Sequence, residues 1–322
     1  RGALGSAEES FRRVADRAEE SNQIELGLEA RIALAEIALS RGASEELTAL
    51  MPKIVNASKE TENPEYYLRS LLILGRFSLR QGERKDAARA FLEVERRAAQ
   101  EGLFLLQAKA RLGIARCLAL ESKYRRALEI VGEATRFFRR DGQIDLLIES
   151  LVEEGDLEYG AGRIATGNDR YDEAEQLAER HDRNLLFADI LVGQARGMIE
   201  DDRLEAATIA LLRALERYRE LRNRHGEAET LRQLAECATE RDQLAAAANY
   251  IDQALEIHRE ADDAIGHARC HLAHAKLDYR RGRFDAAARF AKEAADRFER
   301  AGAHRDRVAS LIQCGRALAE RG

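Results

Sequence analysis

Small and bulky apolar residues recur along the chain at a fixed spacing of forty residues. One series holds only alanine and glycine: Ala35, Gly75, Ala115, Gly155, Ala195, Ala235, Ala275 and Gly315. Sixteen positions further on come Met51, Phe91, Val131, Tyr171, Leu211, Ile251 and Ala291, all bulky except the last. Small residues let two helices approach closely, and bulky neighbours fill the space beside them. The pattern therefore predicts packed pairs of helices, repeated along the chain.

Turn-forming residues lie seven positions after each member of the small series. They are Gly42, Gly82, Ser122, Gly162, Asp202, Asp242, Gly282 and Gly322. Glycine, serine and aspartate are typical of helix ends and tight turns. Each unit of forty residues is therefore a helix, a turn and a second helix, with an apolar face that only its neighbour can cover. We expect an all-α fold, an α-solenoid (superhelix) of antiparallel helix-turn-helix repeats.

This register makes the whole chain, residues 1–322, a single repeat domain. Residues 28–307 hold seven full repeats, residues 1–27 hold the second helix of a truncated repeat, and residues 308–322 hold the first helix of another. The chain also lacks an initiator methionine. We interpret it as part of a longer array or of a larger regulatory protein.

Two segments depart from the pattern. Pro52 lies inside a predicted helix and should kink that helix or delay its start, because proline lacks the backbone N–H. The segment Ala165–Asp169, "ATGND", has poor helix propensity. It predicts a helix that begins only at Asn168 or Asp169, with one of these residues as its cap.

Composition narrows the classes of function. The chain is 34% charged with a net charge of −6, and the two signs are interspersed, which argues against a dedicated nucleic-acid surface. It has no apolar run long enough to cross a bilayer and no signal-peptide pattern. Its four cysteines, Cys117, Cys237, Cys270 and Cys314, lie far apart, which favours a reducing cytoplasm over a disulfide framework.

The sequence resembles the tetratricopeptide repeat family. The dipeptide Leu74–Gly75, followed by Gly82, Ala87 and Phe91, matches that family's order of small residue, turn, small residue and aromatic residue. The chain differs by its lack of tryptophan, its two prolines and its longer period. Such extended repeats are similar to those of maltose-regulator-type bacterial activators, kinesin light chains and Gα-binding spindle-orientation adaptors. The resemblance implies a right-handed superhelix whose first helices line a concave groove.

The resemblance also implies which residues face the groove. They are Arg69, Leu72, Arg76, Arg80, Lys109, Leu112, Arg116, Glu149, Asp156, Tyr159, Asp189, Arg196, Arg232, Lys276 and Tyr279. Five cations gather in the early repeats, where they could clamp an acidic peptide, with Leu72 and Leu112 as apolar anchors. The alternative is that these are ordinary solvated charges on helix surfaces.

The segment "GHARCHLAH", Gly266 to His274, is a candidate metal site. Its residues His267, Cys270, His271 and His274 would share one face of a helix. In register, however, His271 occupies the position held by Leu151, Leu191 and Leu231, which favours a packing face. The segment Gly160–Ala165, "GAGRIA", has dinucleotide-binding spacing but lies between predicted helices instead of after a strand. We expect no cofactor and no enzymatic activity.

The sequence therefore favours a non-catalytic scaffold that binds a peptide or protein segment in its groove. One alternative is a ligand- or effector-sensing domain of a multidomain ATPase or transcription regulator. Another is a structural array that self-associates through its truncated ends. We expect a protein or peptide partner, with an acidic segment as the candidate, and neither nucleic acid nor membrane; the sensor alternative would bind a small molecule or an effector protein.

Overall fold

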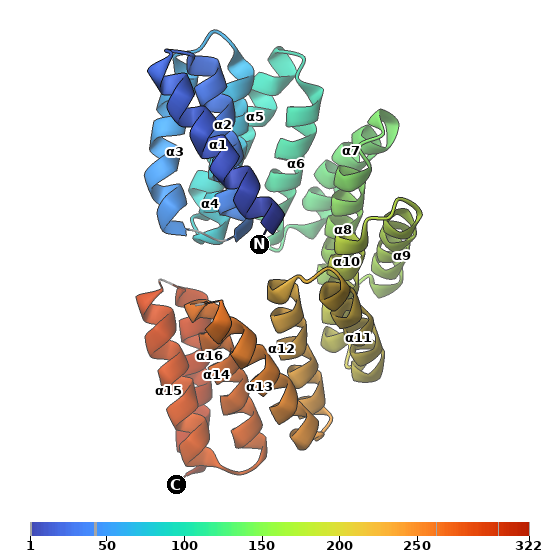
Figure 1. Ribbon diagram of the computed structural model, residues 1–322. Coiled ribbons are helices and arrows are strands. Elements are labelled where there is room, and N and C mark those ends of the chain that lie inside the picture. Colours follow the sequence, from blue (N-terminus) through green and yellow to red (C-terminus); the bar gives the residue numbers. More distant parts are fainter. Residues whose placement is uncertain (1, 42–43, 262, 302, 322) are drawn as a thin grey trace. The chain divides into compact units, whose positions relative to one another are not determined.

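The computed structural model describes residues 2–41, 44–261, 263–301 and 303–321, and these residues form sixteen α-helices (Figure 1). No strand occurs in this part of the chain, and none of its helices is long and apolar enough to cross a membrane. The expected all-α fold of consecutive helix pairs is confirmed.

The chain divides into two compact units, residues 1–167 and 168–322. The first unit holds α1 (Gly2–Glu20), α2 (Ile24–Arg41), α3 (Ser44–Lys59), α4 (Pro64–Arg80), α5 (Arg84–Gln100), α6 (Phe104–Ala119), α7 (Tyr124–Asp141) and α8 (Ile144–Gly160). Helix α9 (Ile164–Arg180) contains the division between the units. The second unit continues with α10 (Asn184–Glu200), α11 (Leu204–Glu220), α12 (Arg224–Glu240), α13 (Leu244–Glu260), α14 (Ala264–Arg280), α15 (Phe284–Arg300) and α16 (His304–Glu320).

Nearly identical turns recur between the described helices at intervals of twenty residues, except between α3 and α4, where no residue has a left-handed backbone. The residue in the left-handed conformation is Asn22, Gly82, Gly102, Ser122, Gly142, Gly162, Asp182, Asp202, Arg222, Asp242 or Gly282. Six of the eight turn positions expected from the sequence are among them, whereas Gly42 and Gly322 lie outside the described residues. The same geometry also separates consecutive hairpins, where the sequence pattern is weaker.

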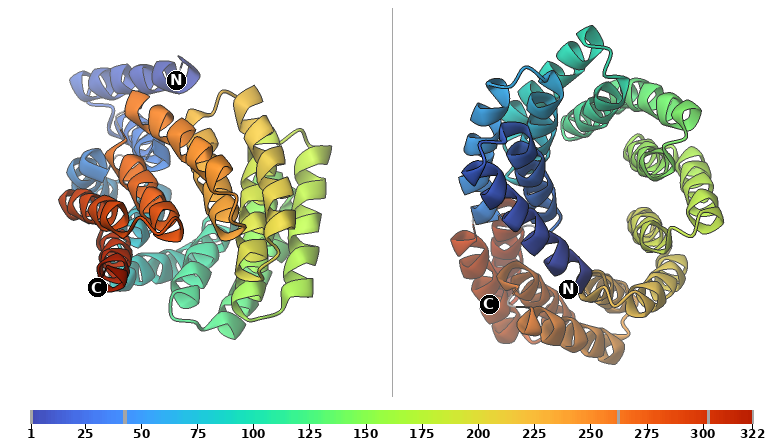
Figure 2. Two further views of the ribbon diagram at one scale, coloured as in Figure 1. Left: turned by 90° about the horizontal axis from the view of Figure 1, so that it is seen from below. Right: turned by 45° about the horizontal axis from the view of Figure 1, so that its top comes forward.

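Each unit has an inner and an outer layer of helices. Consecutive helices are antiparallel neighbours from α1 to α8 in the first unit and from α10 to α16 in the second (Figure 2). The even-numbered helices also contact the next even-numbered helix of their unit, whereas no two odd-numbered helices do so among the described residues. Closer spacing within one layer makes that side of the unit the concave one. We call the even-numbered helices the inner layer and the odd-numbered helices the outer layer.

The small residues of the forty-residue series lie where the two layers meet. Ala35, Ala115, Ala195, Ala235 and Ala275 have no exposed surface. At Gly75 the ring of Phe91, from outer helix α5, lies so close that an added Cβ would be 2.7 Å from it. The same ring lies 2.5 Å from the corresponding point at Gly113 of α6. Phe91 is therefore wedged between two inner helices, each of which has a glycine at the point of contact.

The two irregular segments form helices earlier than the sequence predicts. Helix α3 begins at Ser44 and continues through Pro52, because Leu47, Met51 and Ile54 form a buried stripe that holds it in place. The prediction of a delayed start was therefore wrong.

Helix α9 begins at Ile164, so the predicted start at Asn168 or Asp169 was also wrong. The ring of Tyr159 lies over Gly167, where an added Cβ would be 2.6 Å from it. This packing holds the first turn of α9 in place despite its poor propensity.

Candidate functional site

A hollow of about 410 Å³ opens on the inner layer of the first unit. Helices α4 and α6 form most of its wall, with single contributions from α2 and α5 and two from α8. Its lining residues are Glu36, Glu65, Arg69, Leu72, Ile73, Arg76, Phe91, Leu105, Leu106, Lys109, Leu112, Gly113, Arg116, Leu146 and Glu149. Seven of these are among the groove residues predicted from the sequence. The hollow combines an apolar floor with four cations and three carboxylates.

The floor of the hollow comes from both layers. Leu72 and Leu112 are 8% and 4% exposed, at equivalent positions of neighbouring inner helices. Phe91 reaches the same surface from the outer layer because Gly75 and Gly113 leave room for its ring. An apolar floor of this kind can take the side chain of a bound peptide.

Two carboxylates hold Arg116 in place. Its Nε donates to Oε2 of Glu153 at 2.6 Å, and its Nη2 donates to Oε1 of Glu149 at 2.8 Å. Burial opposes the charge on Arg116, but the two carboxylates outweigh it and raise its pKa. Burial likewise opposes the charge on Glu149, but Arg116, with help from Arg76 and Lys109, lowers its pKa. Arg116 therefore shapes the hollow and has little capacity left for a ligand.

Arg69 is also occupied. Its Nη1 donates to Oε2 of Glu29, forty residues earlier on the neighbouring inner helix, at 2.7 Å. Burial opposes the charge on Arg69, but this hydrogen bond and the charge of Glu29 raise its pKa. Like Arg116, Arg69 links two inner helices.

Arg76 and Lys109 remain the available cations. Neither makes an ion pair or a hydrogen bond with another residue in the described ranges. Both lie beside the apolar floor, and Arg76 is exposed while Lys109 is half-buried. An incoming carboxylate could pair with them without displacing an existing partner.

The other residues predicted for the groove in this unit lie outside the hollow. Arg80 donates to the backbone carbonyl of Leu39, so it joins α4 to α2. Its pKa is lowered by burial and by the neighbouring charge of Arg76. Tyr159 packs over Gly167, and Asp156 is exposed on α8. The structure thus divides the predicted set into lining residues and residues that join helices.

In the second unit, ion pairs and hydrogen bonds occupy most of the predicted residues. Arg232 pairs with Glu229 and with Glu236, the latter at 3.0 Å, and Lys276 pairs with Glu236 at 2.8 Å. Asp189 accepts a hydrogen bond from the hydroxyl of Tyr218. This inner surface is therefore largely neutralised by its own side chains.

Two further predicted residues of the second unit differ in their surroundings. Arg196 is exposed on α10 and has no partner among the described residues. Tyr279 donates a hydrogen bond from its hydroxyl to Oε1 of Glu320 at 3.3 Å and packs edge-on against Phe284. Tyr279 therefore links α14 to α15 and α16.

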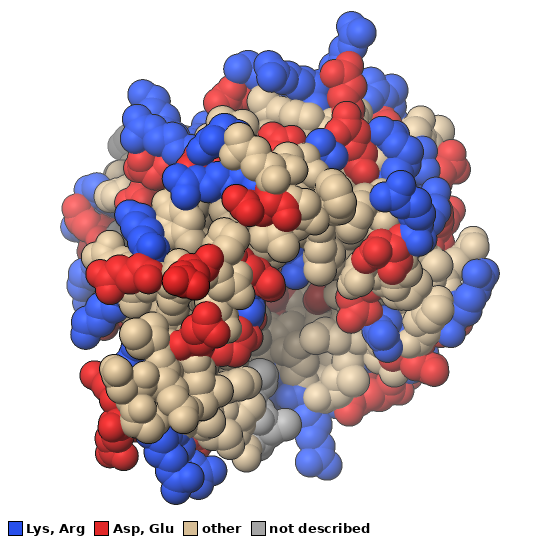
Figure 3. All heavy atoms as spheres, turned by 90° about the horizontal axis from the view of Figure 1, so that it is seen from above, with Lys and Arg blue, Asp and Glu red and all other residues tan. Residues whose placement is uncertain are grey.

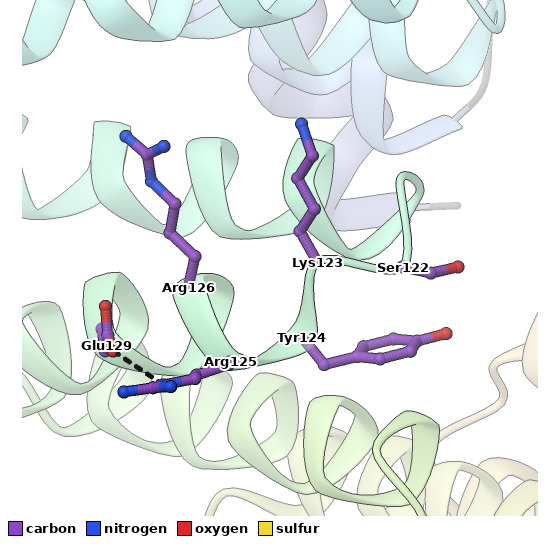
Figure 4. Close-up of a pocket in the computed structure, with 6 residues that line it drawn as sticks. All are labelled: Ser122, Lys123, Tyr124, Arg125, Arg126 and Glu129. Atoms are coloured by element: carbon purple, nitrogen blue, oxygen red, sulfur yellow. Dashed lines mark ion pairs between the residues drawn. The ribbon is translucent and has the colours of Figure 1, made fainter.

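A second, more open hollow of about 490 Å³ lies at the turn before α7. Its lining residues are Ser122, Lys123, Tyr124, Arg125, Arg126 and Glu129. Figure 4 shows Lys123 and Arg126 pointing to the same side, while Arg125 turns toward Glu129, 3.5 Å away. The side chain of Arg125 is 94% exposed, so this hollow is shallow and solvated. It shares no residue with the inner hollow.

One face of the molecule mixes the two signs of charge. In Figure 3, lysine and arginine side chains alternate with aspartate and glutamate over the face in view. Along the helices, oppositely charged side chains form pairs one helical turn apart, such as Arg96 with Glu93 at 2.9 Å.

The histidines of α14 pack against the outer layer. The rings of His267 and His271 lie 4.7 Å apart, and His274 stacks on Phe290 of α15 at 5.2 Å. Burial lowers the pKa of all three, that of His271 to about 4. No group of three or more metal-ligating side chains in the described part of the chain is placed to hold an ion. The favoured interpretation of a packing face agrees with these contacts.

His271 should make the second unit less stable in acid. Its folded pKa of about 4 lies below the ordinary 6.5, so the unfolded chain takes up the proton first. Stability contributed by neutral His271 is therefore lost as the pH falls from about 6.5 toward 4. Glu293 at 3.1 Å favours the proton, whereas Arg297, His267 and His274 oppose it.

Between neutral and mildly acidic pH, we expect the free energy of unfolding of H271L to fall by about 2 kcal/mol less than that of the parent. Leucine fits because Leu151, Leu191 and Leu231 occupy the equivalent positions. Urea unfolding at neutral and mildly acidic pH measures the effect, with substitution of the exposed His304 as the control. An unchanged pH dependence in H271L would contradict the assignment.

Sequence reasoning missed eight lining residues of the inner hollow. They are Glu36, Glu65, Ile73, Phe91, Leu105, Leu106, Gly113 and Leu146. Gly113 carried a usable signal, because a glycine in the middle of a helix usually marks a close contact. The others could be found only from the distance between neighbouring helices.

Comparisons with known proteins agree with the geometry. The tetratricopeptide repeat family model matches residues 226–300, which run from α12 to α15. A search of curated proteins found no matching sequence. The resemblance to tetratricopeptide repeats is confirmed by this match and by the structures that share the fold.

Three solved structures illustrate the shared fold. A Rap protein in complex with competence and sporulation factor is 10% identical, with a TM-score of 0.66 over 99% of both chains. A signal transduction ATPase with a tetratricopeptide repeat sensor, from Pyrococcus horikoshii, is 13% identical, with a TM-score of 0.61 over 84% of this chain and 43% of that one. NprR in complex with its cognate peptide NprX is 16% identical, with a TM-score of 0.56 over 80% and 77%.

Proposed function

We propose that this chain is a non-catalytic binding module that holds an acidic peptide or protein segment in the inner hollow of its first unit. The observation that carries the proposal is the pair of unpartnered cations, Arg76 and Lys109, beside an apolar floor. A ligand carboxylate would pair with these cations, and an adjacent apolar side chain would lie over Leu72 and Leu112. We place this binding in the cytosol, where the four free cysteines stay reduced.

The complex of NprR with its cognate peptide supports the proposal, because that protein shares the fold of this chain. The neutralised inner surface of the second unit favours the first unit as the binding site. There Glu236 already satisfies both Arg232 and Lys276, so a ligand would have to break existing pairs. Breaking such pairs would cost free energy and weaken binding, whereas a ligand of the first unit would have no pair to break.

A second candidate function is the sensing part of a multidomain regulator. It is favoured by the likeness to the repeat sensor of the archaeal signal transduction ATPase, in which the matching part is 43% of the chain. The same hollow would then receive an effector, and the response would occur in another domain. A reading frame that continues into a nucleotide-binding or helix-turn-helix domain would support this alternative.

The binding proposal is tested with a displayed library of random peptides. We expect the selected peptides to pair one or more carboxylates with a leucine-like residue, and to bind more weakly as salt concentration rises. The double variant R76E/K109E should lose about 10- to 100-fold in affinity, measured by fluorescence polarisation.

The matched control is R125E/R126E, which makes the same change of charge in the shallow hollow before α7. It should bind the selected peptides as the parent does. An equal loss of affinity in both double variants would show that only the net charge of the protein matters. Failure to select any acidic peptide would overturn the proposal. Peptides with lysine in place of the acidic residues should regain affinity for R76E/K109E.

A further inference from the structure

The inner hollow of the first unit presents unpaired carboxylates as well as unpaired cations. Besides Arg76 and Lys109, its lining includes the side chains of Glu36 and Glu65. Neither carboxylate forms an ion pair or a hydrogen bond with another residue in the described ranges, and Asn63 accepts only from the backbone N–H of Glu65. The hollow therefore offers free charges of both signs, and a purely acidic ligand would use only half of them.

Glu36 and Arg76 occupy equivalent positions of the neighbouring inner helices α2 and α4, forty residues apart. Three other pairs with this spacing are closed, and in each the carboxylate lies on the earlier helix. They are Glu29 with Arg69 at 2.7 Å, Glu236 with Lys276 at 2.8 Å, and Glu240 with Arg280 at 3.3 Å. Glu36 and Arg76 have the same signs in the same order, but their side chains stay apart and both line the hollow.

The sequence around Glu36 explains why this pair stays open. Its counterpart five repeats later, Glu236, is held by Arg232, one helical turn before it on α12, at 3.0 Å. The counterpart of Arg232 on α2 is Ile32, which has no exposed surface. Glu36 therefore lacks the neighbour that fixes Glu236, and its carboxylate remains available to a ligand.

The separation of Glu36 and Arg76 determines the form of a ligand that could meet both. Packed helices lie about 8–10 Å apart, so the two ligand charges need a similar separation. Alternate side chains of an extended peptide point to one side and are about 7 Å apart. The length and flexibility of a lysine or arginine side chain cover the remaining distance. A basic and an acidic residue two positions apart therefore fit the open pair.

We propose that the ligand of the inner hollow is an amphoteric peptide segment, with a basic residue two positions from its carboxylate. Glu36 holds the basic group, Arg76 and Lys109 hold the carboxylate, and an apolar side chain lies over Leu72. Both charges of the ligand gain charge-assisted hydrogen bonds, and no pair within the protein has to break. A purely acidic segment would bring its carboxylates near the unpaired Glu36, and this repulsion selects against it. The inference rests on the binding function proposed above and narrows its ligand.

The test uses an acidic peptide selected on the parent protein, whose essential carboxylate is found by alanine replacement. It is synthesised with lysine two positions before that carboxylate, with lysine two positions after it, or with methionine at both places. The direction of the bound peptide lets only one lysine reach Glu36. The parent should bind that peptide about three- to tenfold more tightly than the methionine peptide, measured by fluorescence polarisation. In E36Q this preference should disappear.

The matched control is E65Q, which removes the same charge from the lining of the same hollow. Glu65 lies eleven residues before Arg76 on α4, about 16 Å along the helix, so E65Q should keep the preference for lysine. Glu36 is exposed, so E36Q should fold as the parent does, which circular dichroism checks.

Two outcomes would overturn the amphoteric ligand and leave the binding function standing. In one, the parent binds the lysine and methionine peptides equally. In the other, E36Q and E65Q lose the preference equally, so that only the overall charge of the hollow matters. Failure of the library to yield any binding peptide would overturn the binding function as well.

Discussion

Replacing Gly113 with valine should lower the free energy of unfolding of the first unit by about 3 kcal/mol. The Cβ of the new residue would lie 2.5 Å from three ring carbons of Phe91. That ring cannot retreat, because Gly75 of α4 holds its other side at a similar distance. The strain must therefore push α4, α5 and α6 apart. This movement should separate the apolar side chains that form the floor of the hollow.

Chemical denaturation gives the size of this effect, and hydrogen exchange gives its location. Exchange should speed up in α4, α5 and α6 and stay unchanged in α13 to α15, since helices of a repeat array depend mainly on their neighbours. In the double variant G113V/F91L the smaller side chain should relieve part of the strain. The double variant should therefore lose less free energy of unfolding than the sum of the losses in G113V and F91L alone.

The matched control is G132A in the middle of α7. There an added Cβ would lie 3.6 Å from the flexible end of Arg136, an ordinary contact. It should gain about 0.5–1 kcal/mol from helix propensity. A similar gain in G113V would show that Phe91 is not wedged.

Replacing Arg116 with leucine should cost about 2–3 kcal/mol at neutral pH, because Glu149 and Glu153 would be left half-buried without their partner. The figure is at the low end for a buried pair because the Arg116 side chain is 30% exposed. The matched control is R125L, whose side chain is 94% exposed and pairs with Glu129 at 3.5 Å. It should change stability by less than about 0.5 kcal/mol.

Acid should reduce the difference between R116L and the parent. In the parent, the lowered pKa of Glu149 gives stability above the ordinary glutamate range that is lost as pH falls. In R116L, burial without the guanidinium should raise the pKa of Glu149 and raise further that of Glu153, which burial already holds above its ordinary value, so protonation relieves the cost. Denaturation midpoints measured from neutral pH to about pH 4 check this. A difference that grows in acid would show that the cost is lost packing instead of unpaired charge.

The fold could be predicted in outline because each repeat imposes the same packing requirement at the same position. Positions that must be small, such as Ala115 and Ala195, recur at one spacing and are fully buried in the structure. The turns were predictable for the same reason, since they require a left-handed backbone, which glycine adopts readily at positions 82 and 162. The late start predicted for α9 was wrong because tertiary packing by Tyr159 outweighed local propensity.

The candidate site was less predictable, because it depends on which charges neutralise each other. The sequence places Arg69 and Arg76 seven residues apart on one expected helix and Arg116 forty residues after Arg76. The structure separates them, since Arg69 and Arg116 are held by carboxylates of neighbouring helices and Arg76 is not. These pairs depend on distances between helices of different repeats, which a periodic pattern does not specify.

Because a turn recurs every twenty residues, successive helices alternate between the inner and the outer layer. Each helix takes its layer from whether an odd or an even number of connections precedes it, and most of the described turns within and between hairpins share one geometry. Loss or gain of forty residues between two turns leaves every later helix in its own layer. Loss of twenty would move each later inner helix to the outside and expose its apolar surface. Evolution can therefore change the length of this array freely only in steps of whole helix pairs.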